Sequence, residues 1–438
     1  MTRTTPTVPA TAPTFTALAA TPPSAAATAA FTTAPASRTA WPRAERLRAA
    51  GSTAARHAAA ADRDPGLAPE TVTAVTRAGF PAYFVPRGHG GHQGDFTSLL
   101  HAVAELAENC SSAGWCAALW ATHGRYAALL PEEGRREVWT ASPDTRIAAG
   151  LVPRGARAVR HGSHWSLSGR WECVSAVGNS AWVLLAATVD PGPARQPEPG
   201  TRAGMPPGRD GAPDAARVFA VPTAAVEVTA TWDSSGLRGT GSDTVTLAPT
   251  VVPAHRSFDF ADVASGARTA GAAADAVRFD AAGTSGEGTA GPRCHTAPAL
   301  LVGGLVLCAP ALGAARTALR SWTDWAAAKA PLTGSLSAAL GRSSAEIEAA
   351  ELLLTAAARR ADADPVTALA VARNHRDAAV AVDLLVTAVE RLIRSGGPHI
   401  CDATSTVQRC WRDVHAIASH AVLRFEAAAD LYARELLA

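Results

Sequence analysis

Residues 299–330 read ALLVGGLVLCAPALGAARTALRSWTDWAAAKA, and their apolar side chains recur at the spacing of one helix face. Three further segments with the same period follow at 335–361, 364–395 and 402–437. Each of them is much longer than an average helix of about 11 residues. Long amphipathic helices joined by short connections predict an antiparallel four-helix bundle over residues 298–438.

The middle of the chain has a different period. From residue 146 onward apolar and polar residues alternate, as they do in strands with one buried face, and Gly162, Gly169 and Gly178 stand at the ends of such runs. This alternation predicts a middle β domain, of barrel or sandwich type, over residues 146–260. The predicted strands are 156–161, 165–168, 181–189, 217–221, 226–232 and 244–252.

Residues 39–145 have a helical pattern again. Leu99, Val103 and Leu106 mark one apolar face, and the segment 113–130 continues helically up to a proline. The order along the chain is therefore an N-terminal helical domain, a middle β domain and a C-terminal helical bundle. This order predicts a mainly α protein with a central β domain.

Three segments have the composition of irregular structure. Residues 1–38 are Ala, Thr, Pro and Ser without any acidic residue, and we expect a disordered tail there rather than a transit peptide. Residues 190–216 are rich in Pro, Gly and Arg, which predicts a mobile loop between two strands. Residues 261–297 contain a long Ala/Gly/Ser/Thr-rich run and are expected to form a flexible connection.

The composition excludes several classes of protein. The chain has 438 residues, of which 47% are hydrophobic and 18% charged, so it can bury a large core. A net charge of +2 argues against a broad surface for nucleic acid, and the sequence has no run of 18 apolar residues that would predict a membrane span. The seven cysteines show no C-x₂-C spacing, which favours free thiols in a reducing cytoplasm. No metal site is predicted.

Five short motifs then occur in a familiar order. They are Ser111-Ser-Ala-Gly-Trp115 with His123, Leu167-Ser-Gly-Arg-Trp171 with Ser175, Trp232 with Gly236-Leu-Arg-Gly-Thr-Gly-Ser242, Val252-Pro253, and Gln408-Arg-Cys-Trp-Arg-Asp-Val-His415 with His420. Together they make residues 40–438 resemble the acyl-CoA dehydrogenase fold. Within that fold, the chain resembles the flavin-dependent monooxygenases that use reduced flavin from a separate reductase.

The resemblance implies a specific activity. Such an enzyme binds reduced FMN or FAD, adds O₂ to give a C4a-hydroperoxyflavin, and hydroxylates a small organic substrate, here expected to be aromatic and to belong to secondary metabolism. No Rossmann fingerprint is present, so a partner flavin reductase is expected. Relatives are commonly homotetramers, and a cytoplasmic location is expected. The alternatives are an acyl-CoA dehydrogenase-like FAD dehydrogenase, an N- or S-oxygenase, and a non-catalytic ligand-binding relative.

One position separates the two enzyme classes. Acyl-CoA dehydrogenases commonly carry a catalytic Glu shortly after an Arg-Asp pair. Counting from Arg412-Asp413, the matching position is near His420-Ala421, where no acid is present. This favours oxygenation, and Glu426, the nearest acid, keeps the dehydrogenase alternative open.

His420 is the leading candidate for a catalytic residue. We predict that Arg412, Asp413 and His420 lie on one helix, with Asp413 and His420 two turns apart on one face. His415 would lie about 140° around that helix, so only one of the two histidines could face a shared pocket. The resemblance implies that His420 donates a hydrogen bond to the flavin hydroperoxide. The alternative is a helix-face histidine at a subunit interface.

Two further residues are catalytic candidates by resemblance. Ser175 would hydrogen-bond the flavin N5 or O4 region, although the chain reads Cys173-Val174-Ser175-Ala176 where relatives often read Phe-Ser-Ser-Gly. His123 would face the substrate and accept a phenol proton. Their alternatives are an ordinary strand-end serine and a core histidine.

The remaining predicted cofactor contacts are Ser111, Ser112, Trp171 and Arg412. Ser111 and Ser112 open a helix, where backbone N–H groups suit an anionic or carbonyl group of a ligand. Helix capping explains both serines equally well, and packing in the β core is the alternative for Trp171.

Overall fold

The computed structural model describes residues 41, 44–190, 216–265, 292–329 and 331–438. The predicted tail at 1–38 and nearly all of the predicted loop at 190–216 lie outside these residues. The predicted connection at 261–297 begins in a short helix, α6 (Phe260–Ser265), and ends with α7 (Arg293–Thr296). Its middle part also lies outside the described residues.

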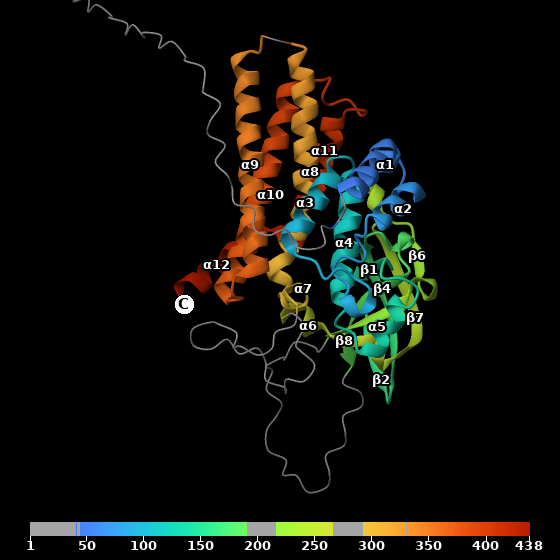
Figure 1. Cartoon of the computed structure of the whole chain (residues 1–438). Helices are drawn as coiled ribbons and strands as arrows, with labels where there is room; N and C mark the ends of the chain where they lie inside the picture. Colours follow the sequence, from blue (N-terminus) through green and yellow to red (C-terminus); the bar gives the residue numbers. More distant parts are fainter. Residues whose placement is uncertain (1–40, 42–43, 191–215, 266–291, 330) are drawn as a thin grey trace, which may run out of the picture. The chain divides into compact units, whose positions relative to one another are not determined.

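The N-terminal part is helical, as predicted. It consists of α1 (Ala44–Arg63), α2 (Pro69–Arg77), α3 (Phe96–Ala107), α4 (Ser111–Ala127) and α5 (Glu132–Trp139). The Asp95 side chain caps α3 by accepting the Ser98 N–H at 2.7 Å, which satisfies a backbone donor that the helix leaves free. Nearly every residue of α4 is buried, and this helix contacts both α8 (Ala299–Ala327) of the bundle and strand β1 (Ile147–Gly150) (Figure 1). Because it contacts both, α4 connects the bundle to the sheet.

The strands of the described residues form one sheet in the order β6-β7-β3-β2-β4-β5-β8, with β1 pairing parallel to β4. Strand β2 also runs parallel to β4, and the other pairs are antiparallel. The bounds are β1 Ile147–Gly150, β2 Arg157–His161, β3 His164–Val174, β4 Trp182–Asp190, β5 Ala216–Pro222, β6 Glu227–Thr229, β7 Asp243–Pro253 and β8 Ser257–Asp259.

Both faces of the sheet centre are buried. Along β4, Val183 and Leu185 face one apolar cluster, while Leu184 and Ala186 face another, because successive side chains point to opposite faces. The first cluster also contains side chains of β3 and β7, so the sheet curls over its own core. The second contains Leu130 of the segment after α4, so helices cover that face.

The predicted strand at 226–232 is shorter than expected. Only Glu227–Thr229 pairs with β7. The backbone N–H groups of Thr231 and Trp232 donate instead to one carboxylate oxygen of Asp243, at 3.0 and 3.1 Å. A side-chain acceptor therefore replaces the ladder at this end of the strand.

The C-terminal helices form the predicted bundle, with α8 (Ala299–Ala327), α9 (Gly334–Ala363), α10 (Ala368–Gly396) and α11 (Thr406–Ala418) side by side (Figure 1). Within the described part of the chain, α8 alone is long and apolar enough to cross a membrane, although the sequence has no unbroken run of 18 apolar residues. Its most apolar window is 78% buried, as in the core helix of a bundle.

The prediction of one continuous helix over 402–437 is wrong. Helix α11 ends at Ala418, a 3₁₀ turn follows at Ala421–Leu423, and α12 (Phe425–Leu437) begins after it. His420 lies in the break, where its Nδ1 accepts the Val422 N–H at 3.3 Å. Asp413 and His420 are thus not on one helix, because the imidazole caps the turn and does not continue α11.

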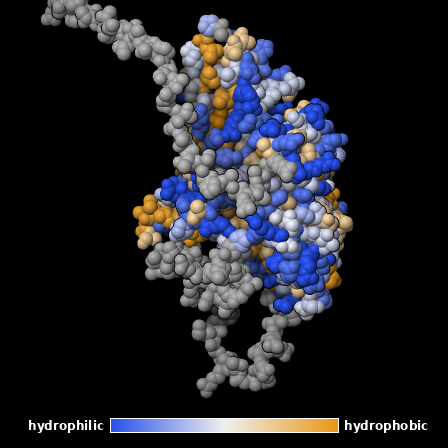
Figure 2. Space-filling model, viewed as in Figure 1, coloured by the Kyte–Doolittle hydropathy of each residue, from blue (hydrophilic) through white to orange (hydrophobic). Residues whose placement is uncertain are grey.

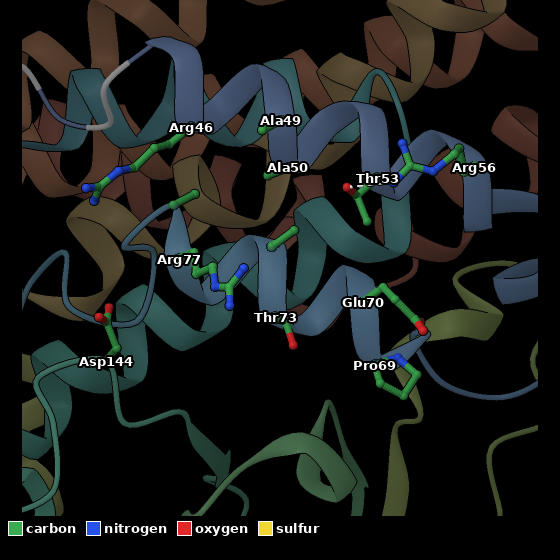
Figure 3. Close-up of a pocket in the computed structure, with 12 residues that line it drawn as sticks. Arg46, Ala49, Ala50, Thr53, Arg56, Pro69, Glu70, Thr73, Arg77 and Asp144 are labelled. Carbon is green, nitrogen blue, oxygen red and sulfur yellow. Dashed lines mark hydrogen bonds between the residues drawn. The ribbon is translucent and has the colours of Figure 1, made fainter.

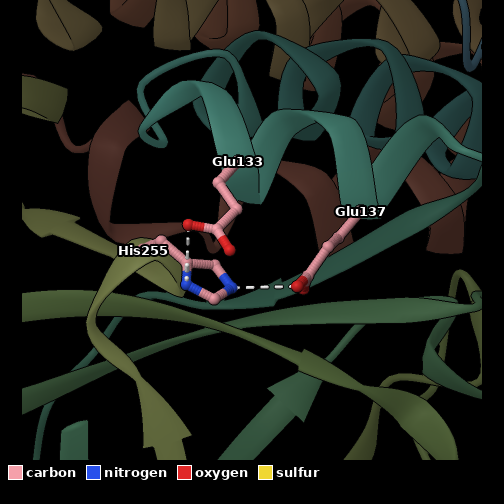
Figure 4. A group of neighbouring side chains, drawn as sticks. All are labelled: Glu133, Glu137 and His255. Atoms are coloured by element: carbon pink, nitrogen blue, oxygen red, sulfur yellow. Dashed lines mark hydrogen bonds and ion pairs between the residues drawn. The ribbon is translucent and has the colours of Figure 1, made fainter. Parts of the chain in front are cut away.

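A cluster of one histidine and two glutamates connects α5 to the segment before β8 (Figure 4). His255 contacts Glu137 at 2.9 Å through Nε2 and Glu133 at 3.4 Å through Nδ1, and Arg256 also pairs with Glu137. Both ring nitrogens of His255 contact carboxylates, and one of these carboxylates also forms an ion pair with an arginine. The cluster therefore joins α5 to this segment through contacts of His255 with two carboxylates and an ion pair between Arg256 and Glu137.

Substituting Glu137→Gln is expected to lower the free energy of unfolding by about 1 kcal/mol, because a half-buried carboxylate that pairs with Arg256 and contacts the His255 ring is lost. Denaturant titration at low salt measures this change. Glu133→Gln is the matched control, since the Glu133 side chain is 65% exposed and its contact is longer. An equal loss in both variants would contradict the assignment of these contacts to Glu137.

Candidate functional site

Three of the motifs meet at one place. The indole N–H of Trp115 on α4 donates to the hydroxyl of Ser175, just after β3, at 3.1 Å. The Trp115 ring also lies beside the His420 ring, with centroids 6.2 Å apart. An apolar ring, a half-buried hydroxyl and an imidazole therefore come together from segments far apart in the sequence.

The His420 imidazole has a defined proton arrangement. Its Nδ1 accepts the Val422 N–H, so the neutral ring carries its proton on Nε2. The residue is exposed, yet desolvation by the surrounding protein lowers the pKa of His420 below its ordinary value. At neutral pH this side chain is consequently a neutral hydrogen-bond donor that solvent or a ligand can reach.

Asp413 holds the glycine-rich loop against α11. Its carboxylate accepts the Leu237 N–H at 2.7 Å and a hydrogen bond from the Ser111 hydroxyl. A Cβ atom on Gly236 would lie 2.2 Å from the Arg412 carbonyl oxygen, so only glycine allows this close approach. Burial raises the pKa of Asp413 to about 6, although the two hydrogen bonds lower it.

A chain of hydroxyl groups runs from Ser175 into this loop. Ser175 lies 2.7 Å from Ser242, and Ser242 lies 2.7 Å from Thr240, between hydroxyl oxygens. Thr240 in turn donates to the Leu237 carbonyl oxygen at 2.9 Å. Thr240 and Ser242 stand in the 236–242 motif but were not among the predicted site residues. The signal was two hydroxyl residues within a glycine-rich run.

The turn that carries Ser175 is strained. Cys173 and Ala176 have φ values of 56° and 57°, a left-handed conformation that costs residues other than glycine about 1–2 kcal/mol. Ala176 takes the place where relatives often have glycine, and its N–H still donates to the Thr240 carbonyl at 2.8 Å. Alanine at position 176 therefore does not break the contact between this turn and the glycine-rich loop.

Substituting Cys173→Gly is expected to raise the free energy of unfolding by roughly 0.5–1 kcal/mol, since the exposed Cys173 side chain loses little packing and the backbone strain is relieved. Thermal and urea unfolding measure the gain. Cys401→Gly is the control, because Cys401 is also exposed but has no positive φ. A gain at both positions would show that loss of a thiol, not backbone strain, is responsible.

The other residues predicted at the amino end of α4 and on α11 also surround the loop. Ser112 packs against Gly239, and Ser111 bonds to Asp413. Arg412 pairs with Asp62 of α1 at 2.6 Å and donates to the Ser235 carbonyl. In the described residues these side chains hold protein segments together, and their cofactor contacts stay predictions.

Two predicted site residues lie elsewhere. His123 is 6% exposed, with Nδ1 2.8 Å from the Ile147 carbonyl oxygen, and burial lowers its pKa to about 4. It therefore has the contacts of a core histidine. Trp171 is 2% exposed and donates its indole N–H to the Ala186 carbonyl at 2.7 Å, as a packing residue of the sheet core does.

The two histidines of the last motif also separate. His415 packs beside Trp411, with ring centroids 4.8 Å apart, and lies 3.6 Å from the Glu390 carboxylate. The structure thus places His420, and not His415, beside Trp115.

The large cavity between α1 and α2 is a separate feature (Figure 3). It has a volume of about 870 Å³ and is lined by Arg46, Arg56 and Arg77 together with Glu70 and Asp144. Ser175, Trp115 and His420 do not line it. The cluster around Ser175 is therefore chosen as the candidate site for its hydrogen-bonding groups, although it does not line this cavity.

The chain is similar to known proteins in family, sequence and fold. The family described as "Acyl-CoA dehydrogenase, C-terminal domain" matches residues 305–425. The oxygenase component of an FADH₂-dependent resorcinol hydroxylase from Rhizobium is 27% identical over 84% of this chain and 87% of its own length. The oxygenase subunit HsaA of a flavin-dependent monooxygenase from Mycobacterium tuberculosis is 28% identical over 81% of this chain and 85% of its own length.

Solved structures show the same fold. The 3-HSA hydroxylase from Rhodococcus aligns with a TM-score of 0.75 at 22% identity, over 90% of this chain and 96% of that protein. XiaF from Streptomyces, solved with FADH₂ and glycerol, aligns with a TM-score of 0.74 at 23% identity, over 90% and 94%. With its motifs, its fold and these relatives taken together, the chain has the acyl-CoA dehydrogenase fold and is similar to the oxygenase components of two-component flavin-dependent monooxygenases.

Proposed function

We propose that this oxygenase takes reduced flavin from a separate reductase and uses it with O₂ to hydroxylate a small aromatic substrate. The observation that carries the proposal is the exposed His420 imidazole, whose Nε2–H has no hydrogen-bond partner in the described part of the chain, beside the Trp115 ring that holds Ser175. Relatives whose names state aromatic substrates support it, among them the resorcinol hydroxylase and a p-hydroxyphenylacetate 3-hydroxylase from Acinetobacter baumannii.

The residues at this site fit a flavin. A flavin ring needs hydrogen-bond partners at its edge, and the half-buried Ser175 hydroxyl, which the buried Trp115 indole holds in place, offers one. When bound, reduced flavin supplies the activation of O₂ and the transfer of one oxygen atom. The chain's own residues bind the ring, keep water away from it and hold protons at defined atoms.

Each residue has a role in this proposal. Ser175 contacts the edge of the flavin ring through its Oγ, and Trp115 sets the position of that oxygen. His420 donates a hydrogen bond from Nε2 to the oxygen that is to be transferred. A neutral imidazole suits this work because its Nε2–H donates a hydrogen bond without placing a positive charge at the site.

The experiment is a rapid-mixing test. The enzyme is mixed without oxygen with photoreduced FMN or FAD, and then with oxygenated buffer. We expect a transient absorbing species that differs from both reduced and oxidised flavin, and NAD(P)H alone should not reduce the flavin. Oxidation no faster than that of free flavin, with no transient species, would refute the proposal. Separate FMN and FAD arms show which cofactor binds.

The structure gives the dehydrogenase alternative no support. That chemistry needs a carboxylate base at the site, and Glu426 was the nearest acid in the sequence. Glu426 is exposed at the start of α12, which packs on α10. Burial and then the nearby Glu426 charge raise the pKa of Asp383 on α10, so Glu426 lies toward that helix.

We also propose a cytoplasmic homotetramer. Free thiols at all seven cysteines suit a reducing compartment. Figure 2 shows hydrophobic surface on the bundle and near the C-terminus. The exposed apolar side chains include Leu352 on α9, which is 72% exposed, and Leu437 on α12, which is 85% exposed. Such residues suit contacts between copies of the chain. Light scattering of the purified protein measures the number of subunits.

A further inference from the structure

The hydroxyl chain beside the site has one proton arrangement that makes every contact a hydrogen bond. At one end the Trp115 indole N–H can only donate, and at the other end the Leu237 carbonyl can only accept. Three hydroxyls with one proton each stand between them. Thr240 must therefore donate to Leu237, Ser242 to Thr240, and Ser175 to Ser242.

This arrangement determines what Ser175 can offer a ligand. Its single proton is used toward Ser242, and one of its lone pairs accepts the Trp115 N–H. The second lone pair is left, so Ser175 is an acceptor toward anything bound beside it. Thr240 is 1% and Ser242 4% exposed, so water does not compete for their protons.

The accepting end of the chain is held in place. The Leu237 N–H donates to Asp413 at 2.7 Å, and the Trp232 indole N–H donates to the Leu237 carbonyl at 3.0 Å. Leu237 also has a left-handed φ of 52°, and these two hydrogen bonds stabilise that conformation. The direction of the chain is thus set by backbone and side-chain contacts away from the ligand.

We infer that Thr240 and Ser242 are positioning residues that make Ser175 a hydrogen-bond acceptor and so select reduced over oxidised flavin. Reduced flavin carries a proton at N5, whereas oxidised flavin has a lone pair there. An acceptor facing N5 therefore pairs with the reduced form and leaves the oxidised form without a donor. The inference rests on the proposed function, because it takes flavin as the ligand beside Ser175.

The test compares affinities of the two flavin states. In Ser242→Ala the Ser175 proton loses its partner and turns toward the ligand. In Thr240→Val, which keeps the side-chain shape, Ser242 can donate to Ser175 and release the same proton. The ratio of Kd for oxidised flavin to Kd for reduced flavin is expected to fall about tenfold in both variants. Anaerobic fluorescence titration with oxidised and photoreduced FMN and FAD measures it.

The midpoint potential of the bound flavin gives a second readout. Since tighter binding of the reduced form raises the potential, a tenfold fall in the ratio lowers it by about 30 mV for two electrons. Thr244→Val is the matched control. Thr244 is 3% exposed and its hydroxyl pairs with Thr231 at 2.8 Å, outside the chain of hydroxyls, so its ratio and potential should stay at the wild-type values.

The outcomes separate the two proposals. An unchanged ratio in folded Ser242→Ala and Thr240→Val overturns the inference, as does an equal shift in Thr244→Val. If Ser242→Ala does not fold, Thr240→Val decides the matter alone. Wild-type protein that binds neither flavin state overturns the proposed function as well, whereas normal wild-type binding with unchanged ratios overturns only the role of Thr240 and Ser242.

Discussion

Substituting His420→Ala is expected to lower the yield of hydroxylated product by about 100-fold, while reduced flavin is still oxidised. The imidazole is the neutral donor beside Trp115, and its Nε2–H has no partner among the described residues. Without it, oxygen should leave as hydrogen peroxide. Product and peroxide are measured together against the amount of reduced flavin supplied.

The matched control is His415→Ala, which removes a histidine five residues earlier that contacts Trp411 and Glu390. Its product yield should stay near that of the wild type. His420→Gln retains a side-chain N–H donor and should recover part of the yield, without the pH dependence of an imidazole. An equal loss of hydroxylated product per reduced flavin in the His415→Ala and His420→Ala variants would show a general effect of disturbing this region.

Substituting Asp413→Ala is expected to lower the free energy of unfolding by about 3 kcal/mol, because the Leu237 N–H and the Ser111 hydroxyl both lose a buried acceptor. The glycine-rich loop, whose Leu237 backbone is strained, would also lose its attachment to α11. Urea unfolding measures the stability. A change below 1 kcal/mol would show that the loop is held by its other contacts.

Asp413→Asn tests the pH dependence of the same group. Burial raises the pKa of Asp413 to about 6 in the folded protein, above its ordinary value of 3.8. The folded state therefore binds this proton more tightly, and the contribution of Asp413 to stability falls as pH rises from about 4 to 6. The asparagine variant lacks this titration. As the pH rises from 4 to 7, the wild type should therefore lose unfolding free energy relative to the asparagine variant.

Part of the site was predictable from short motifs. Ser111, Ser175 and His420 each stand in a motif, and the structure brings them to one region around Trp115 and the glycine-rich loop. The end of α11 was not predictable, because no glycine or proline marks it. For that reason Asp413 and His420 do not share one helix face as predicted, although both residues belong to the region.

Some residues that belong to these motifs do not lie at the site. His123 and Trp171 stood in motifs as well, yet the structure buries both with their polar atoms bonded to backbone carbonyls. A motif identifies a position in the fold. The packing around that position decides whether its side chain reaches a cavity or the core.

By itself, the sequence determined the order of helical, β and helical parts, because the periods of 3.6 and 2 are local properties of each segment. The tertiary structure alone decided which side chains meet, how far Asp413 is desolvated, and that Ser175, Ser242 and Thr240 share one chain of hydrogen bonds. Ser175 and Ser242 are 67 residues apart, and no local pattern encodes such a contact. Desolvation and proton direction depend on all neighbours at once, and only the folded chain supplies them.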